Sequence, residues 1–312
     1  MIVRAYEQLN NSFRKELIYK VGTNAGFFSE YNNMILAMLF CLEHKIKFKL
    51  CAGPTNFHLQ EGWNGFFLPF CPQVTDDKKH YKTSNWKYAL KLIVRDRRMD
   101  AWKDLYPYFS FGKTQLRTQD VFGRSRDPYR AKRNYYIPEL GIEGDIQHAC
   151  SKLIEITWRY NSTTQKAIDQ FKNTVNLPEK YIGFHIRGGD KFVEHKLEPI
   201  TAYFSQVKNT AIKTGFVLTD DYAVIKQIHQ SYPEWDISTF CQKEEHGFFF
   251  RDFSSLPTNQ QHKQFLRLFA SIDLLAQSEQ FIGTFSSNPG MYLGMRNASI
   301  CTGVDFNSWK LW

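Results

Sequence analysis

Apolar segments that run into glycine or polar residues recur along this 312-residue chain, and stretches of helical periodicity lie between them. In the first half, residues 17–21 are expected to form a short strand and residues 22–26 a turn-rich loop. An apolar helix is expected at 31–44 and an alternating strand at 45–50. A strand, a glycine-containing loop, a helix and a second strand are the units of a parallel α/β sheet. The first half is therefore predicted to be an α/β domain.

The second half shows the same pattern after a long amphipathic stretch at 145–171. Its expected elements are strands at 181–187, 215–219 and 280–284, and helices at 201–214, 222–231, 263–278 and directly after Pro289. Two α/β series joined by a mostly helical connection predict two Rossmann-like domains that face each other across a cleft, at 1–172 and 173–312. Ligands of such sheets bind at the carboxyl ends of the strands.

Composition excludes several classes of protein. Hydrophobic residues make up 43% of the chain and aromatic residues 16%, which argues against intrinsic disorder. No segment approaches the roughly 18 consecutive apolar residues of a membrane-spanning helix, and the N-terminus lacks the apolar core of a secretory signal. The six cysteines are scattered, so we interpret them as buried hydrophobic residues rather than metal ligands. These features predict a soluble, cytoplasmic protein.

Positive charge is concentrated between Asp77 and Arg133, where the sequence has 16 Lys and Arg residues but 6 Asp and Glu residues. The net charge of this basic segment is +10, whereas the whole chain carries +9. Tyrosines and tryptophans lie among the basic residues, a combination found in sites for nucleic acids, anionic sugars, glycans and membrane surfaces. No helix-turn-helix, zinc-finger or RNA-recognition motif accompanies the segment, which disfavours nucleic acid. A solvated helical face above buried aromatics is the plain structural alternative.

The sharpest motif ends the expected strand at 181–187, and it reads His185-Ile186-Arg187-Gly188-Gly189-Asp190-Lys191. His185 and Arg187 lie two residues apart, so their side chains share one face of a strand. The glycines allow the backbone to turn sharply and approach a ligand. A guanidinium can donate two parallel hydrogen bonds to a phosphate. The alternative is a salt bridge between Arg187 and Asp190 that closes the loop.

An acidic pair, Asp220 and Asp221, follows the expected strand at 215–219. Two acids after a strand can bind a metal ion, but a metal site needs further ligands, and none is evident in the sequence. The pair can instead accept hydrogen bonds from a ribose, or one of the two can cap the next helix.

A loop of hydroxyl residues, Thr284-Phe285-Ser286-Ser287, follows the third expected strand, and a helix is expected to begin after it. Hydroxyls and free N–H groups at a helix N-terminus form a site for anions such as phosphate. A plain helix cap is the alternative. Polar residues at three strand ends in one half of the chain are more than turns require.

Read together, these motifs resemble the donor-binding motifs of the fucosyltransferase superfamily. The α1,6-fucosyltransferases are the most similar group, and the α1,2- and protein O-fucosyltransferases are more distant. The superfamily shares a strand ending in His-x-Arg-x-x-Asp, an acidic pair after a threonine, and a Thr-Phe-Ser-Ser loop, which are matched at 185–190, 219–221 and 284–287. A weaker likeness covers 18–70, including the loop that begins at Gly26, and none covers 75–140.

The resemblance implies a GT-B fold, GDP-fucose as the donor, inversion at the anomeric carbon of fucose, and no metal ion or other cofactor. The N-terminal domain would bind a glycan acceptor and the C-terminal domain the GDP-sugar. Arg187 would bind the β-phosphate, and His185 would lie near the guanine or ribose. Further donor contacts are implied for Gly26, Gly188, Lys191, Asp220, Asp221, Asp273, Thr284, Ser286 and Ser287. Glu194 lies near the family's catalytic carboxylate, with Asp190 as the second choice of base and His195 and Glu198 behind it.

Two positions depart from the α1,6 pattern. The family's second arginine is replaced by Gly188, so phosphate neutralisation falls on Arg187 with Lys191 or a basic residue of the other domain. The family's guanine-binding acid aligns with Ser271, and Asp273 is the candidate replacement. Two alternatives therefore stay open: a transferase for another nucleotide sugar, and a non-catalytic protein that binds glycans or nucleic acid through the basic segment. That segment could also contact a membrane or another anionic surface.

Overall fold

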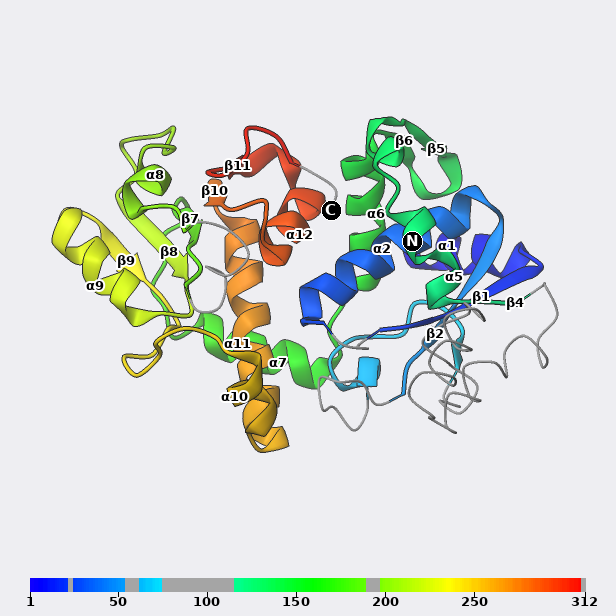
Figure 1. Cartoon of the computed structure of the whole chain (residues 1–312), viewed down its shortest axis with the longest axis horizontal. Coiled ribbons are helices and arrows are strands. Elements are labelled where there is room, and N and C mark those ends of the chain that lie inside the picture. Colours follow the sequence, from blue (N-terminus) through cyan, green and yellow to red (C-terminus); the bar gives the residue numbers. More distant parts are fainter. Residues whose placement is uncertain (22–24, 54–61, 75–114, 189–196, 310–312) are drawn as a thin grey trace, which may run out of the picture. The chain divides into compact units, whose positions relative to one another are not determined.

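The computed structural model describes residues 1–21, 25–53, 62–74, 115–188 and 197–309 (Figure 1). The chain divides into two compact units, Met1–Asn161 (unit 1) and Ser162–Leu311 (unit 2). Helix α7 (Ser162–Lys172) falls in unit 2, whereas the expected boundary followed it, because α7 packs along α11 (Thr258–Gln277) of the same unit.

Unit 1 is built on a parallel sheet with the strand order β3-β2-β1-β4. The strands are β1 (Lys15–Lys20), β2 (Ile46–Cys51), β3 (Gln73–Val74) and β4 (Gln115–Arg117). The helices are α1 (Ile2–Ser12), α2 (Phe27–Glu43), α5 (Thr118–Ser125) and α6 (Ile146–Thr157), with 3-10 turns η1 (Gly62–Gly65), η4 (Pro128–Lys132) and η5 (Pro138–Leu140). An antiparallel hairpin, β5 (Tyr135–Ile137) and β6 (Ile142–Gly144), precedes α6.

Helix α2 forms the centre of unit 1. Almost every residue from Phe27 to Leu42 is buried, because β2, α5 and α6 all pack around this helix. From Met34 to Leu42 its sequence is apolar on every side, which is the pattern of a fully buried helix. Asn10 of α1 supports the sheet beside it, since its amide donates to the Phe48 carbonyl at 2.9 Å and accepts from the Phe48 N–H at 2.7 Å.

Unit 2 contains a parallel sheet with the strand order β11-β10-β7-β8-β9. The strands are β7 (Ile182–His185), β8 (Thr214–Leu218), β9 (Asp236–Ser238), β10 (Gln280–Gly283) and β11 (Cys301–Gly303). Besides α7 and α11, the helices are α8 (Ile200–Phe204), α9 (Tyr222–Ser231), α10 (Phe250–Ser255), α12 (Asn288–Arg296) and the 3-10 turn η7 (Ala298–Ile300).

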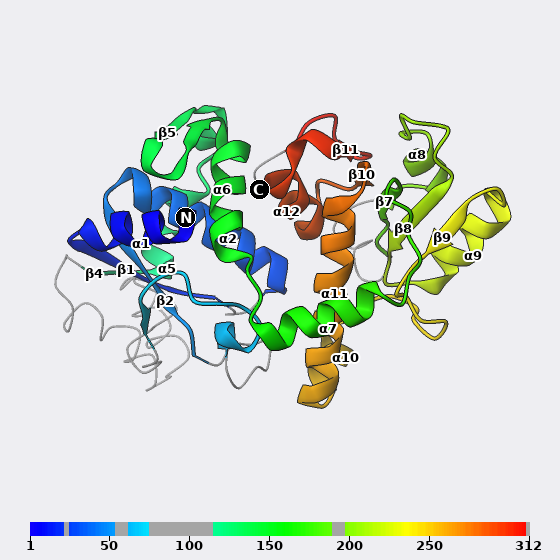
Figure 2. The ribbon, with the colours of Figure 1, turned by 180° about the vertical axis from the view of Figure 1, so that it is seen from behind.

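Helices cover both faces of the unit 2 sheet. Figures 1 and 2 show α8 and α9 on one side and α11 and α7 on the other. On the first side, Phe184 of β7 stacks on Phe204 of α8 with ring centroids 4.8 Å apart, and Trp235 packs on both rings. On the second side, α11 lies against β7 and β8. Every residue of β7 is buried, as a central strand covered on both faces requires.

The expected α/β fold with parallel sheets is therefore confirmed in both units, but several expected elements differ. The helix expected at 201–214 ends at Phe204, and the stretch at 145–171 is two helices, α6 and α7, separated between Trp158 and Asn161. Among the described residues, no helix is long and apolar enough to span a bilayer.

Candidate functional site

The strand order of unit 2 reverses between β7 and β10. Chain connections leave β7 toward β8 and β9 on one side, while β10 and β11 extend the sheet on the other. In open parallel sheets, ligands bind at the carboxyl ends of the strands where the order reverses, because loops on the two sides diverge there. In this unit, that point lies between the residues after His185 and the loop after Gly283.

The His185–Gly188 motif follows this rule. His185 ends β7 and is 5% exposed, with its Nδ1 atom 3.4 Å from the Ser287 hydroxyl of the neighbouring loop. Arg187 lies two residues further along and is partly exposed at the carboxyl edge. A guanidinium in this position lies where an anionic ligand of the sheet would bind.

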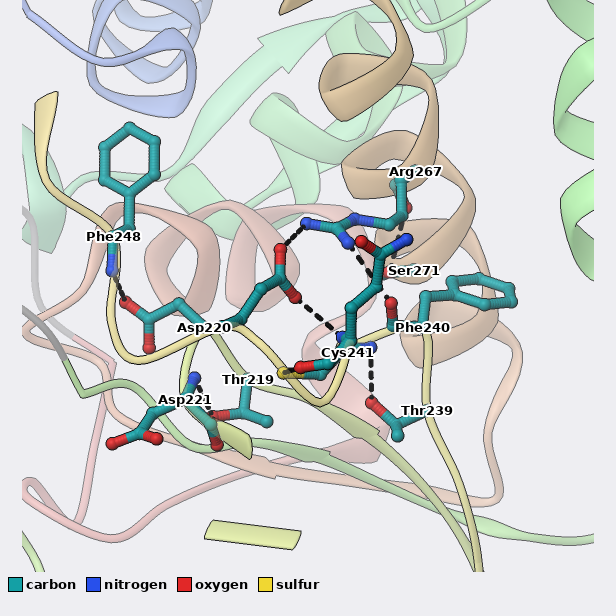
Figure 3. A network of polar contacts seen from close by, with 11 residues as sticks. Thr219, Asp220, Asp221, Thr239, Phe240, Cys241, Phe248, Arg267 and Ser271 are labelled. Carbon is teal, nitrogen blue, oxygen red and sulfur yellow. Dashed lines mark hydrogen bonds and ion pairs between the residues drawn. The ribbon is translucent and has the colours of Figure 1, made fainter. Parts of the chain in front are cut away.

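Asp220 connects the ends of β7 and β8 to the loop after β9 (Figure 3). Its carboxylate accepts a hydrogen bond from the Gly188 N–H at 2.7 Å and from the Phe248 N–H at 3.0 Å, while its carbonyl accepts from the Gly247 N–H at 2.7 Å. Gly247 has a φ of 108°, a conformation that favours glycine and lets this loop turn back. The carboxylate therefore fixes two separate loops at the strand ends.

Asp221 has a different role, since it caps helix α9. Its carboxylate accepts from the Ala223 N–H at 2.9 Å, as the helix-cap alternative predicted. Its backbone pairs with His246, and the Thr219 hydroxyl accepts from the Asp221 N–H at 3.2 Å. Both acids are thus held by backbone groups, and no cluster of three or more potential metal-ligating side chains occurs in the described part of the chain.

A second polar network lies beside Asp220 and holds the loop after β9 against α11 (Figure 3). Arg267 forms an ion pair with Glu245 and donates to the Phe240 carbonyl at 3.3 Å. The Thr239 hydroxyl donates to the Val217 carbonyl at 2.7 Å and accepts from the Cys241 N–H at 3.0 Å. Burial, reinforced by the Glu245 carboxylate, raises the pKa of Cys241 to about 12, so its thiol stays protonated at neutral pH.

The hydroxyl loop at 284–287 is organised by Asp305, which follows β11. The Asp305 carboxylate accepts from two consecutive backbone groups, the Phe285 N–H and the Ser286 N–H, each at 2.8 Å. Burial raises the pKa of the nearby Tyr203, and the carboxylates of Asp305 and Glu198 raise it further. Asp305 is not part of a recognisable sequence motif, so the sequence analysis did not identify it as a residue that organises this loop. Its position depends on the pairing of β10 with β11.

Ser287 is the N-cap of α12. Its hydroxyl donates to the Thr284 carbonyl at 2.8 Å and accepts from the Gly290 N–H at 3.2 Å, and the side chain is fully buried. A Cβ at Gly290 would lie 2.0 Å from the Thr284 carbonyl oxygen, so this turn requires glycine. Ser286 and Thr284 are partly exposed, and they are the hydroxyls of the loop that a ligand can reach.

Asp273, the expected guanine-reading acid, is 7% exposed on its side chain and lies in an ion-pair network. Its Oδ1 accepts from Arg296 at 2.6 Å and its Oδ2 lies 3.8 Å from the Lys172 ammonium. Ser271 is buried, and its hydroxyl donates to the Arg267 carbonyl one turn earlier, at 2.8 Å. In this structure, Asp273 is therefore engaged by two cationic side chains, and the Ser271 hydroxyl is engaged by its own helix.

Gly26 lies in unit 1, where it is the exposed N-cap of α2. The adjacent Ala25 N–H donates to the buried Glu30 carboxylate at 3.2 Å. The expected base Glu194, its alternatives Asp190 and His195, and Lys191 lie outside the described residues. So do residues 77–114 of the basic segment. In its described part, Arg130 and Arg133 both pair with Glu43, which is a structural role.

No family model matches this sequence, and no curated protein matches it. A structure of NodZ α1,6-fucosyltransferase soaked with GDP-fucose aligns with a TM-score of 0.54 at 14% identity, over 90% of this chain and 92% of that chain. A structure of fucosyltransferase NodZ from Bradyrhizobium gives 0.53 at 13% identity, over 90% and 92%.

A third structure, POFUT1 in complex with GDP-fucose, aligns with a TM-score of 0.51 at 10% identity, over 93% of this chain and 96% of that chain. At such identities the likeness concerns the fold. This chain has the fold of the fucosyltransferases, as its motifs predicted, and the expected GT-B class is confirmed.

Proposed function

We propose that this protein is a glycosyltransferase that transfers fucose from GDP-fucose to a glycan hydroxyl, with inversion and without a metal ion. The observation that carries the proposal is the position of Arg187. It follows the central strand β7, at the point where the strand order reverses, beside the hydroxyl loop that follows β10. The same fold occurs in structures obtained with GDP-fucose and GDP.

The chemistry requires the diphosphate to leave as the bond to fucose breaks. An enzyme without a metal ion must stabilise the negative charge on that leaving group with fixed cations and hydrogen-bond donors. We assign this role to the Arg187 guanidinium, with the Ser286 and Thr284 hydroxyls as further donors. Asp305 supports the loop by holding its two backbone N–H groups.

The acceptor hydroxyl must lose a proton as it attacks the fucose carbon. A carboxylate close to that carbon can accept the proton. The resemblance to the α1,6-fucosyltransferases assigns this role to Glu194, with Asp190 as the second candidate. The α1,6 linkage is the first to test, because the three motifs are most similar to that group.

A second candidate function is a transferase that uses another nucleotide sugar. The environment of Asp273 favours it, because the acid expected to read guanine is paired with Arg296 and Lys172 instead. Guanine would then be read by other groups, or another base would take its place.

Labelled donors distinguish these functions. We expect transfer of labelled fucose from GDP-fucose to a glycan array in excess EDTA. Transfer only from GDP-mannose or a UDP-sugar would support the second candidate. Loss of transfer in EDTA, with recovery on addition of Mg²⁺ or Mn²⁺, would contradict metal independence. Absence of binding to any nucleotide sugar would contradict both functions.

A further inference from the structure

We propose that Phe248 and Phe249 form a platform on which the base of the donor nucleotide stacks. This inference rests on the proposed function, because it assumes a nucleotide donor in unit 2. It adds residues outside the three sequence motifs, and it explains how a base can be held without the acid expected at Ser271.

The first observation is exposure. Phe248 is 36% exposed and Phe249 is 44% exposed, and they are adjacent in the chain. Two adjacent, partly exposed phenyl groups offer apolar surface that a planar ligand can cover favourably. The Phe248 ring is held from one side by Phe253, with centroids 5.6 Å apart, so it is positioned before any ligand arrives.

The second observation is the anchor of the loop. The Asp220 carboxylate that accepts the Phe248 N–H also accepts the Gly188 N–H. Phe248 is therefore tied through one carboxylate to the residue directly after Arg187. Figure 3 shows the Phe248 ring pointing away from that carboxylate and from the Arg267 network. The backbone is fixed at the strand ends while the ring is left at the surface.

The third observation is the topology of the sheet. In a Rossmann-like sheet the phosphates lie where the strand order reverses, and the ribose lies near the acid that ends the next strand. Here these places are β7 with Arg187 and β8 with Asp220. A nucleotide extended in that direction brings its base to the loop after β9, and this loop carries Phe248 and Phe249. The base is therefore the occupant that the exposed rings fit best.

Stacking acts on the face of a base, so it does not require an acid that reads the edge of guanine. The Phe248 and Phe249 rings would contribute equally for any purine. Base stacking on an aromatic side chain changes affinity by about 5-fold to 150-fold when the aromatic residue is replaced by alanine.

The experiment measures binding of GDP and of inorganic pyrophosphate by calorimetry. We expect Phe248→Ala and Phe249→Ala each to weaken GDP binding about 10-fold and to leave pyrophosphate binding unchanged, because pyrophosphate has no base. The matched control is Phe122→Ala, since Phe122 in unit 1 is also 36% exposed. Thermal unfolding verifies that each variant is folded, and Phe248→Tyr, which keeps a ring, should bind GDP like the wild type.

The outcomes are distinct. If the wild type binds GDP and both alanine variants bind it equally well, the platform is wrong and the proposed function stands. If both variants keep GDP affinity but raise the KM for the acceptor, the rings serve the acceptor, and the platform is again wrong. If the wild type binds no nucleotide, the proposed function fails together with the platform.

Discussion

The two units share a sheet topology but differ at the point where the strand order reverses. In unit 1 this point lies between β1 and β4, where the Lys20 N–H donates to the Thr118 hydroxyl at 2.9 Å and joins the strand ends. In unit 2 it lies between β7 and β10, where Arg187 and the 284–287 loop extend beyond the strands. The order of the first four strands is therefore the same in both units, and the described residues after the strands differ.

The two units also use the carboxylates near their strand ends differently. In unit 1, Glu30 is buried in the first turn of α2 and accepts from one loop N–H group. A carboxylate there disfavours a phosphate at the helix N-terminus. In unit 2, Asp220 and Asp305 each accept hydrogen bonds from two backbone N–H groups. Arg187 supplies a cationic side chain at this edge of the sheet. The difference supports the proposal that unit 2, and not unit 1, binds the diphosphate of the donor.

Replacement of Arg187 tests this assignment most directly. We expect Arg187→Ala to lower kcat/KM by about 10³-fold or more, because fixed donors to a developing charge are worth about 10²–10³-fold each and this one is also charged. Arg187→Lys should also be poor, since an ammonium cannot donate two parallel hydrogen bonds. Arg124→Ala, on an exposed arginine of unit 1, is the control. Wild-type turnover in either Arg187 variant would contradict the assignment.

Replacement of Glu194 tests whether unit 2 also supplies the base. We expect Glu194→Gln to lower kcat by at least about 10²-fold, with unchanged affinity for GDP, because the base contacts the acceptor and not the nucleotide. Single-turnover rates and GDP calorimetry measure the two quantities. A near-normal kcat in Glu194→Gln beside an inactive Asp190→Asn variant would move the role to Asp190.

Replacement of Asp305 tests whether loop positioning is specific to unit 2. An asparagine can accept from one of the two N–H groups but turns its own NH₂ toward the other, which leaves a donor unsatisfied at a cost of about 1–3 kcal/mol. We expect Asp305→Asn to weaken GDP binding about 10-fold. Asp236→Asn, on the exposed first residue of β9, is the control and should have no effect. Equal GDP affinity in the two variants would show that Asp305 does not position the donor loop.

The smallest expected effect on donor binding comes from a change in unit 1. Asn10→Ala removes two hydrogen bonds to the Phe48 backbone and should lower the free energy of unfolding by about 1–3 kcal/mol. Binding of GDP to unit 2 should not change. Urea unfolding and GDP calorimetry on the same sample measure both quantities. If Asn10→Ala raised the Kd for GDP as well as lowering stability, donor binding would depend on unit 1, contrary to the proposal that unit 2 alone binds the donor.

Sequence reasoning found what depends on local pattern. The central strand β7, helix α9 and the polar ends of three strands follow from apolar runs and the residues after them. The predicted length of α8 was wrong, because the helix gives way to turns after Phe204 although the helical periodicity of the sequence continues.

Long-range pairing was not accessible from the sequence. Asp273 aligned near a family position, but its partner Lys172 lies about a hundred residues away in the chain. Asp305 is one acid without a motif, and only the pairing of β10 with β11 brings it to the loop. Phe248 is one of three consecutive phenylalanines, and its exposure depends on how Asp220 holds the loop.

Asp305 follows the 284–287 loop in the chain, so the order of synthesis determines when this loop can form its contacts with Asp305. The ribosome adds β11 and Asp305 after the other four strands of the unit 2 sheet, and domains generally begin to fold while synthesis continues. Until Asp305 emerges, the Phe285 and Ser286 N–H groups lack their carboxylate, although the segment that bears Arg187 is already synthesised. A nascent chain could thus form most of the sheet and still lack a competent donor loop. We expect fragments that end before Asp305 to bind GDP more weakly than the whole chain, even if they are stable enough to escape proteolysis.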